Sequence, residues 1–230
     1  ALGRRFRPVA VAPPLRLELE PILATAAKPF DDEYWLFELK WDGLRAMTFG
    51  QDQTLRLTGR RGTSLTGHFP ELRYLRAHLA AESFVVDGEL VVLDPEGRPE
   101  FSRVLSRLKA PSHRAFKRLA RTDKATYYIF DLLYLDGHDL RGLPLERRRA
   151  LLAEVFRPNP WIRLSETISG SGRALFALTL ERGLEGLMAK HRQSPYLSGR
   201  SPAWKKLKAR HTADVVVVGY TPHKAQALFG

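Results

Sequence analysis

The sequence contains no cysteine among its 230 residues. This absence excludes disulfide bonds and thiolate metal sites, so any bound metal ion must take oxygen or imidazole ligands. Long apolar runs are also missing, since an aliphatic run such as Val215 to Val218 has only four residues and a membrane span needs roughly 18. We therefore expect no membrane-spanning helix and no membrane partner.

Acidic residues are scarce relative to basic ones. The chain has 25 Asp and Glu against 37 Lys and Arg, which gives a formal net charge of +12 and an isoelectric point near 10.2. This balance favours a partner rich in phosphates. The alternative is compositional drift, because Arg outnumbers Lys 27 to 10, as a GC-rich genome can produce.

The arginines at positions 4, 5 and 7 precede Pro8 rather than an apolar segment, so we expect no secretory signal and a cytoplasmic location. The length predicts one large domain, or one domain plus a fragment. Residues 1–30 are rich in proline and are expected to form an N-terminal arm, either extended or briefly helical. Residues 31–212 would form the domain, and residues 213–230 a last strand and hinge.

Strands at irregular spacing, interrupted by helices, predict an α+β fold with largely antiparallel sheets flanked by helices. Residues 34–40 and 44–49 are predicted to pair as a hairpin, because Asp42-Gly43 between them is a strong turn signal. Further strands are expected at 54–58, 84–93, 126–135, 161–168, 185–190, 204–208 and 214–219. Helices are expected at 70–79, 101–108, 144–156 and 172–182.

One segment is strongly basic. Residues 103–124 hold eight Lys or Arg and a single acid, Asp123. This pattern is typical either of a surface that follows a phosphate backbone or of an ordinary solvated helix and loop.

The segment Lys40-Trp41-Asp42-Gly43-Leu44-Arg45 places a lysine at the end of one predicted strand and an arginine on the next. A hairpin there would aim both cations into one pocket, although a strand-end lysine is ordinarily a solvated charge.

KWDGLR resembles the first motif of the covalent nucleotidyltransferases, the superfamily of ATP-dependent DNA ligases, RNA ligases and mRNA capping enzymes. The other motifs of the superfamily follow in its order: TGRRG at 58–62, VDGEL at 86–90, YYIFDLLYLDG at 127–137, EGLMAK at 185–190 and WKKLK at 204–208. The resemblance covers residues 34–220. It implies an ATP-grasp-like adenylation domain.

The resemblance also implies a mechanism in which Lys40 attacks the α-phosphate of ATP, expels pyrophosphate and holds AMP as a phosphoramidate. A free lysine has a pKa near 10.4, so deprotonating it at pH 7 costs roughly 4.6 kcal/mol. Neighbouring cations and a divalent metal ion would favour the neutral amine.

The basic residues of the last motifs are expected at the phosphates. Lys206 and Lys208 would share one face of a strand, with Lys205 and Leu207 on the other. The resemblance implies that Lys190, Lys206 and Lys208 contact the α-phosphate. An exposed basic edge strand is the alternative for 205–208.

The acids of the motifs are expected at the sugar and the metal ion. The resemblance assigns Glu89 to the ribose or a metal ion, and Glu185 to a metal ion, either Mg²⁺ or Mn²⁺. A structural salt bridge is the alternative for each.

The remaining nucleotide contacts come from four motif residues. Phe130 resembles the aromatic residue that stacks on adenine, although strand aromatics are more often core. Glu38 would lie on the same strand face as Lys40 and help hold the nucleotide. Arg60 resembles the contact to the ribose or the nick phosphate, and Arg45 would join the cations of the pocket.

The motif set is most similar to the compact bacterial end-joining ligases of the ligase D and ligase C type. This implies ATP as cofactor, nicked duplex DNA as partner, a bacterial cytoplasmic location, a monomer, and Ku or polymerase modules as candidate partners. The family's OB-fold after residue 230 is absent from the sequence, so we expect nucleotide binding with poor nick sealing. An RNA ligase, a GTP-dependent capping guanylyltransferase and a non-catalytic basic nucleic-acid-binding module are the alternatives.

Overall fold

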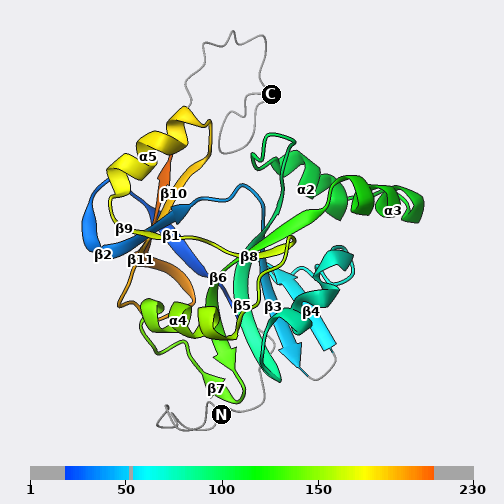
Figure 1. Ribbon diagram of the computed structural model, residues 1–230, viewed down its shortest axis with the longest axis horizontal. Coiled ribbons are helices and arrows are strands. Elements are labelled where there is room, and N and C mark those ends of the chain that lie inside the picture. The colour runs from blue at the N-terminus through cyan, green and yellow to red at the C-terminus, as the bar shows by residue number, and fades with distance from the viewer. Residues whose placement is uncertain (1–18, 52–53, 210–230) are drawn as a thin grey trace, which may run out of the picture.

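The computed structural model describes residues 19–51 and 54–209. Two β-sheets pack face to face, and helices cover their outer faces (Figure 1). This is the predicted α+β arrangement. In the described ranges, no helix has the length and apolar character needed to cross a membrane.

The first sheet has the strand order β1-β11-β10-β2-β9. Its strands are β1 (Ile22–Ala26), β2 (Asp32–Leu39), β9 (Ile168–Gly170), β10 (Gly186–His191) and β11 (Gly199–Lys208). All pairs are antiparallel except β1 with β11, which are parallel. Strand β1 therefore belongs to the sheet, although it lies within the segment expected to be an N-terminal arm.

The second sheet has the order β4-β3-β5-β6-β7, and β8 pairs in parallel with β6. Its strands are β3 (Leu44–Gln51), β4 (Thr54–Gly59), β5 (Ser83–Val92), β6 (Ala125–Leu135), β7 (His138–Asp139) and β8 (Ile162–Leu164). The long strands β5 and β6 form its centre and are buried along nearly their whole length.

The helices lie on the outer faces of the two sheets, except α3, which extends outward from α2. They are η2 (Pro70–Tyr74), α1 (Leu75–His78), α2 (Phe101–Leu108), α3 (His113–Thr122), α4 (Leu145–Val155) and α5 (Gly172–Glu181). A large core forms between the second sheet and α1, α2 and α4, and a small core lies under α5. A third cluster, which includes Phe130 and Trp204, fills the space between the sheets.

The predicted hairpin of residues 34–40 and 44–49 is wrong, because β2 and β3 belong to different sheets. Residues 40–43 carry the chain from one sheet to the other. Gly43 is needed for close packing rather than for a turn: a Cβ there would lie 2.2 Å from the carbonyl oxygen of Leu90. The glycine of Asp42-Gly43 is required here by the close approach of the Leu90 backbone. An Asp-Gly pair in the sequence is equally typical of a hairpin turn, so the sequence alone does not distinguish the two cases.

Two other predicted elements differ from the structure. The strand expected at 161–168 is two short strands in different sheets, β8 and β9, because the chain crosses between the sheets at Ser165. The helix expected at 70–79 begins as a 3₁₀ helix, and the buried pair Leu72 and Leu75 has the three-residue spacing that such a helix aligns. The other strands and helices predicted before residue 209 lie within two residues of the observed bounds, although β11 extends five residues further toward the N-terminus. The strand expected at 214–219 and the hinge at 213–230 lie outside the described residues.

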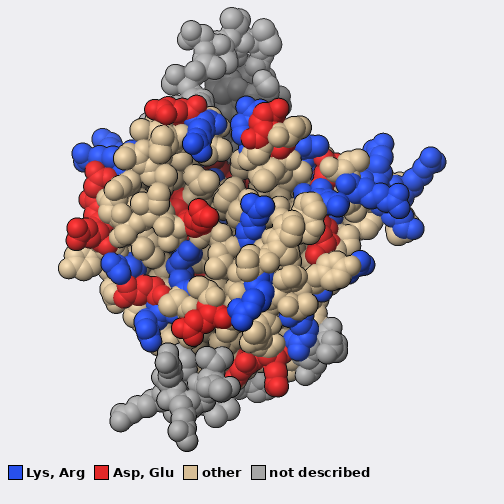
Figure 2. All heavy atoms as spheres, in the orientation of Figure 1, with Lys and Arg blue, Asp and Glu red and all other residues tan. Residues whose placement is uncertain are grey.

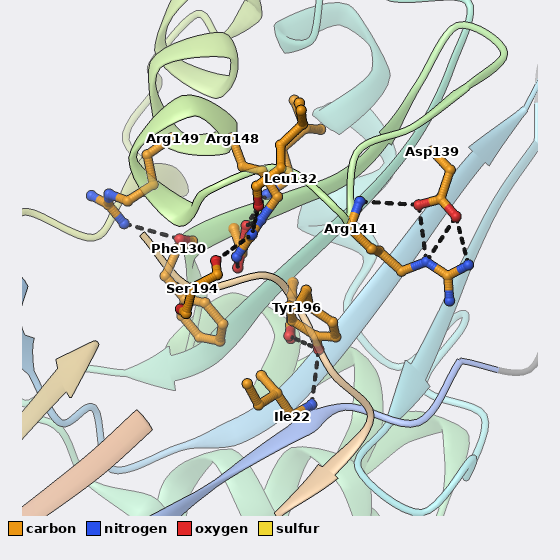
Figure 3. Close-up of polar contacts among 12 residues, drawn as sticks. Ile22, Phe130, Leu132, Asp139, Arg141, Arg148, Arg149, Ser194 and Tyr196 are labelled. Atoms are coloured by element: carbon orange, nitrogen blue, oxygen red, sulfur yellow. Dashed lines mark hydrogen bonds and ion pairs between the residues drawn. The ribbon is translucent and has the colours of Figure 1, made fainter. Parts of the chain in front are cut away.

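Helix α4 ties the two layers together through arginines. Arg148, fully buried, forms two hydrogen bonds of 2.8 Å to the Asp131 carboxylate and one of 3.0 Å to the Ser194 carbonyl. The adjacent Arg149 donates to the carbonyls of Phe130 and Ser165. Both side chains extend from α4 toward the strand that carries Phe130 (Figure 3). These hydrogen bonds from Arg148 and Arg149 fix the position of β6 and of the Phe130 side chain that it carries.

Candidate active site

A cleft of about 580 Å³ opens between the two sheets. Strands β2, β10 and β11 supply residues to one wall, with alternate residues lining the cleft on β10 and β11, while β3, β5 and β6 supply the other wall. The cleft brings together all ten residues predicted for the site: Glu38, Lys40, Arg45, Arg60, Glu89, Phe130, Glu185, Lys190, Lys206 and Lys208.

Lys40 lies directly after β2, and its side chain is only 20% exposed. Its Nζ contacts the Glu185 carboxylate in a close ion pair. Glu185 also forms an ion pair with Lys208, whose Nζ lies 3.1 Å from the carboxylate. One acid therefore links two of the lysines that were predicted for the site. The nearest charge to Lys40 is therefore an acid, whereas the sequence predicted mainly cations around it.

Strand β11 separates its lysines as the alternation predicts. Lys206 and Lys208 line the cleft. Lys205 faces the other way, with its Nζ 4.2 Å from the centre of the Trp35 ring, and Leu207 is fully buried. Two positive charges are thus presented on one side of the strand.

The floor of the cleft is a buried cluster of charge and aromatic rings. Glu38 is 2% exposed and forms ion pairs with Lys190 and, at 3.5 Å, with Arg149. Lys190 Nζ lies 3.8 Å from the Phe130 ring centre and 4.0 Å from that of Trp204. Burial lowers the pKa of Lys190 to about 8, against the opposing effect of Glu38. The Lys190 side chain is 1% exposed, against 54% for Lys208, and its contact with the α-phosphate stays a prediction.

Three buried polar atoms of this floor lack a hydrogen-bond partner among the described residues: Glu38 Oε2, Lys190 Nζ and Trp204 Nε1. The first two take part in ion pairs, Glu38 Oε2 with Arg149 and Lys190 with Glu38. Buried polar groups are nearly always hydrogen-bonded in native proteins. All three residues line the cleft. An acceptor and a donor are therefore available to a bound molecule.

The Arg45 guanidinium donates two hydrogen bonds of 2.6 Å to the Asp87 carboxylate. Burial opposes the charge of Arg45, yet the Asp87 carboxylate raises the pKa of Arg45 above its ordinary value. Tyr196 donates a further 2.6 Å hydrogen bond to Asp87 and accepts one from the Ile22 amide, which fastens β1 to the other sheet (Figure 3). Arg45 lies 4.7 Å from the Phe130 ring centre, so it supports that ring as well as lining the cleft.

Asp87 was not predicted, although strand alternation places it on the same face as Glu89, two residues on. Tyr196 lies in the connection between β10 and β11, and no sequence signal marks it.

Glu89 is a candidate cation ligand. Burial raises the pKa of this carboxyl to about 8, despite the opposing charges of Arg45 and Lys40. Burial and the Glu185 charge also raise the pKa of nearby Asp42. No group of three or more His, Cys, Asp or Glu in the described ranges is placed to hold a metal ion alone. Mg²⁺ is usually bound by one or two carboxylates together with substrate phosphates, and Glu89 and Glu185 fit that requirement.

Arg60 and its neighbour Arg61 lie in the turn after β4, both exposed at the rim of the cleft. The cleft also contains residues that the sequence did not single out, Trp41, Met188, Trp204 and Arg200. Met188 precedes Lys190 by two residues on β10, so alternation could have identified it.

The arrangement divides the cleft into two regions. Its floor offers an aromatic ring, a thioether and polar atoms without a hydrogen-bond partner among the described residues, which suit a planar heterocyclic base. Its mouth offers Arg60, Lys206 and Lys208, which suit phosphates, and Lys40 lies between acid and cations as a candidate nucleophile.

Comparison with known proteins identifies the family of this chain. The family described as "ATP dependent DNA ligase domain" matches residues 18–208. The chain belongs to the ATP-dependent DNA ligase domain family. The three alternatives, an RNA ligase, a capping guanylyltransferase and a non-catalytic module, are not favoured.

The ligase domain is similar to several characterised proteins. It is 38% identical over 208 residues to the multifunctional non-homologous end joining protein LigD of Pseudomonas aeruginosa, covering 90% of this chain and 24% of that protein. It is 32% identical to the SPbeta prophage-derived DNA ligase-like protein LigB of Bacillus subtilis, covering 87% and 70%. The structure of mycobacterial DNA ligase D complexed with ATP and MES matches with a TM-score of 0.69 and 34% identity, covering 83% of this chain and 60% of that one. The ligase domain thus spans about a quarter of the LigD relative.

Proposed function

We propose that this ligase domain uses ATP to adenylate Lys40 and then passes the AMP to the 5′-phosphate of a DNA nick, in end joining in the bacterial cytoplasm. The observation that carries the proposal is the position of Lys40, whose amine lies in the cleft against Glu185 rather than in solvent. Lys206 and Lys208 line the same cleft, where phosphate charge would develop.

The first step forms one bond and breaks another. The Lys40 amine attacks the α-phosphorus, a nitrogen–phosphorus bond forms, and the α–β bridging bond breaks to release pyrophosphate. The proton lost from Nζ has an acceptor in Glu185, which the amine already contacts. Lys206 and Lys208 neutralise the charge that builds on the phosphates.

The floor of the cleft holds the base. Phe130 and Met188 would enclose adenine, while Glu38 Oε2 accepts a hydrogen bond from it. Glu89 and Glu185 would hold Mg²⁺ or Mn²⁺, which when bound supplies charge neutralisation at the phosphates. We propose that the protein acts as a monomer, with Ku or polymerase modules as partners in end joining.

Intact-mass measurement after incubation with ATP or GTP tests the nucleotide. We expect the mass of one adenylyl group to be added from ATP, nothing from GTP, and nothing with Lys40→Ala. Lys28→Ala, an exposed lysine outside the cleft, is the matched control and should accept AMP. A guanylyl adduct, or an adenylyl adduct that survives Lys40→Ala, would contradict the proposal.

A further inference from the structure

Helix α3 carries a stripe of cations that the nucleotide cleft does not use. Arg114, Lys117, Arg118 and Arg121 are all exposed. Their spacing of i, i+3, i+4 and i+7 places them on one face of the helix, over about 10 Å. The helix contains no acidic residue, and none of its residues is buried.

The stripe has no acidic partner in the described part of the chain. The ion pairs of this basic segment involve Arg103, with Glu100 and Asp123, and Arg107, with Glu71. The four stripe cations neighbour one another at spacings of three and four, where like charges oppose helix formation. A solvated helix would ordinarily intersperse acids among these positions. Because no acid among the described residues pairs with these four cations, their charge favours binding of an anion from outside the chain.

A rigid support connects this stripe to the cleft. Arg107 of α2 is fully buried and donates to Glu71 at 2.8 and 3.1 Å, and to the carbonyls of His68 and Asp123 at 2.8 Å. From the same helix, Phe101 and Leu108 line the cleft. Helix α3 extends outward from α2 (Figure 1), and Lys and Arg gather on this projection in the space-filling view (Figure 2).

We propose that the α3 stripe binds the phosphate backbone of duplex DNA beyond the nick, as a second contact that orients the duplex while its nick occupies the cleft. The proposal rests on the proposed function for its choice of polymer. An exposed row of four cations at regular helical spacing suits the repeating charges of a continuous phosphate backbone. The rings of His113 and Phe116 on the same helix stack on each other, with centroids 6.3 Å apart.

The test compares two variants with the same net charge. The stripe variant combines Arg114→Gln, Lys117→Gln, Arg118→Gln and Arg121→Gln. The control combines Lys28→Gln, Arg147→Gln, Arg157→Gln and Arg173→Gln, which are exposed cations outside α3. Glutamine is a good helix former, and removing like charges should leave the thermal midpoint of the stripe variant no lower than that of the wild type.

Binding to a nicked duplex is measured by fluorescence anisotropy over a range of salt concentrations. We expect the stripe variant to bind at least about tenfold more weakly than the control. Its log–log salt slope should fall by about 0.9 for each DNA phosphate that the variant no longer neutralises, up to about 3.6. Both variants should still gain AMP in the intact-mass assay.

Equal affinities and slopes for the two variants would overturn the α3 proposal. So would a stripe variant that loses binding to single-stranded RNA of equal length but retains duplex binding. A wild-type chain that gains no AMP would instead contradict the proposed function, while the comparison of variants would still decide the role of α3.

Discussion

Single residues in the cleft work as matched pairs of opposite charge: Lys40 with Glu185, Lys190 with Glu38, and Arg45 with Asp87. Burying an unpaired charge is costly, and the attraction within each pair offsets part of that cost. The pairs also fix the direction of each side chain. Preorganised charge of this kind stabilises a phosphoryl-transfer transition state without reorganisation at the moment of reaction.

Gly43 sets the crossing between the sheets, immediately after Lys40 and its two neighbours. A Cβ at this position would lie 2.2 Å from the Leu90 carbonyl oxygen, so the backbone must move. We expect Gly43→Ala to lower the free energy of unfolding by about 2 kcal/mol or more and to abolish adenylation. Gly142→Ala is the control, since a Cβ there meets no atom within 4 Å. Urea denaturation of both variants measures the difference, and equal midpoints would refute the packing role.

Glu89 gives a pH dependence of stability. Its pKa is raised from 4.5 to about 8 in the folded protein, so the folded state retains the proton and stability falls as pH rises through this window. We expect Glu89→Gln to gain about 2 kcal/mol over the wild type at pH 8, and much less at pH 4.5. Thermal unfolding at both pH values measures this gain. The exposed Glu96→Gln should show no such trend, and a gain independent of pH would contradict the account.

At the scale of elements, strand β11 carries a lysine for packing on one face and a lysine that lines the cleft on the other. Lys205 packs over Trp35 and Phe30, whereas Lys206 lines the cleft. We expect Lys206→Ala to slow adenylation about 100-fold with little change in stability, by loss of phosphate stabilisation. Lys205→Ala should lower stability by about 0.5–1 kcal/mol and leave the rate within a few-fold. Single-turnover adenylation and urea denaturation separate the two effects, and equal rates in both variants would contradict the alternation.

The sequence predicted the elements well where periodicity determines them. Alternation in 204–208 correctly separated Lys206 from Lys205, because a strand permits only two faces. The pairing of strands was harder to predict. The same apolar alternation suits 34–40 and 44–49 whether they form one hairpin or join two sheets, and only the contact of Gly43 with Leu90 decides between them. Tyr196 was missed because a loop residue gains its role from distant partners, Asp87 and Ile22.

At the scale of the whole molecule, two sheets close on each other and leave the cleft between them, and α3 projects outward from α2. The chain has a net charge of +12, and its cations differ in their partners. In the cleft, Lys40 and Lys190 form ion pairs with acids, whereas the cations of the α3 stripe lack acidic partners in the described ranges. The ligase domain spans about a quarter of the LigD relative. The activity proposed for this chain by itself is therefore the adenylation of Lys40.

The most direct test of this account locates the adenylyl group on the chain. After incubation with ATP and Mg²⁺, the full chain is digested and its peptides are fragmented under conditions that preserve a phosphoramidate. We predict a single adenylyl group on the Lys40 side chain. An adenylyl group on Lys190 or Lys206, or a chain that remains unmodified, would contradict the central claim.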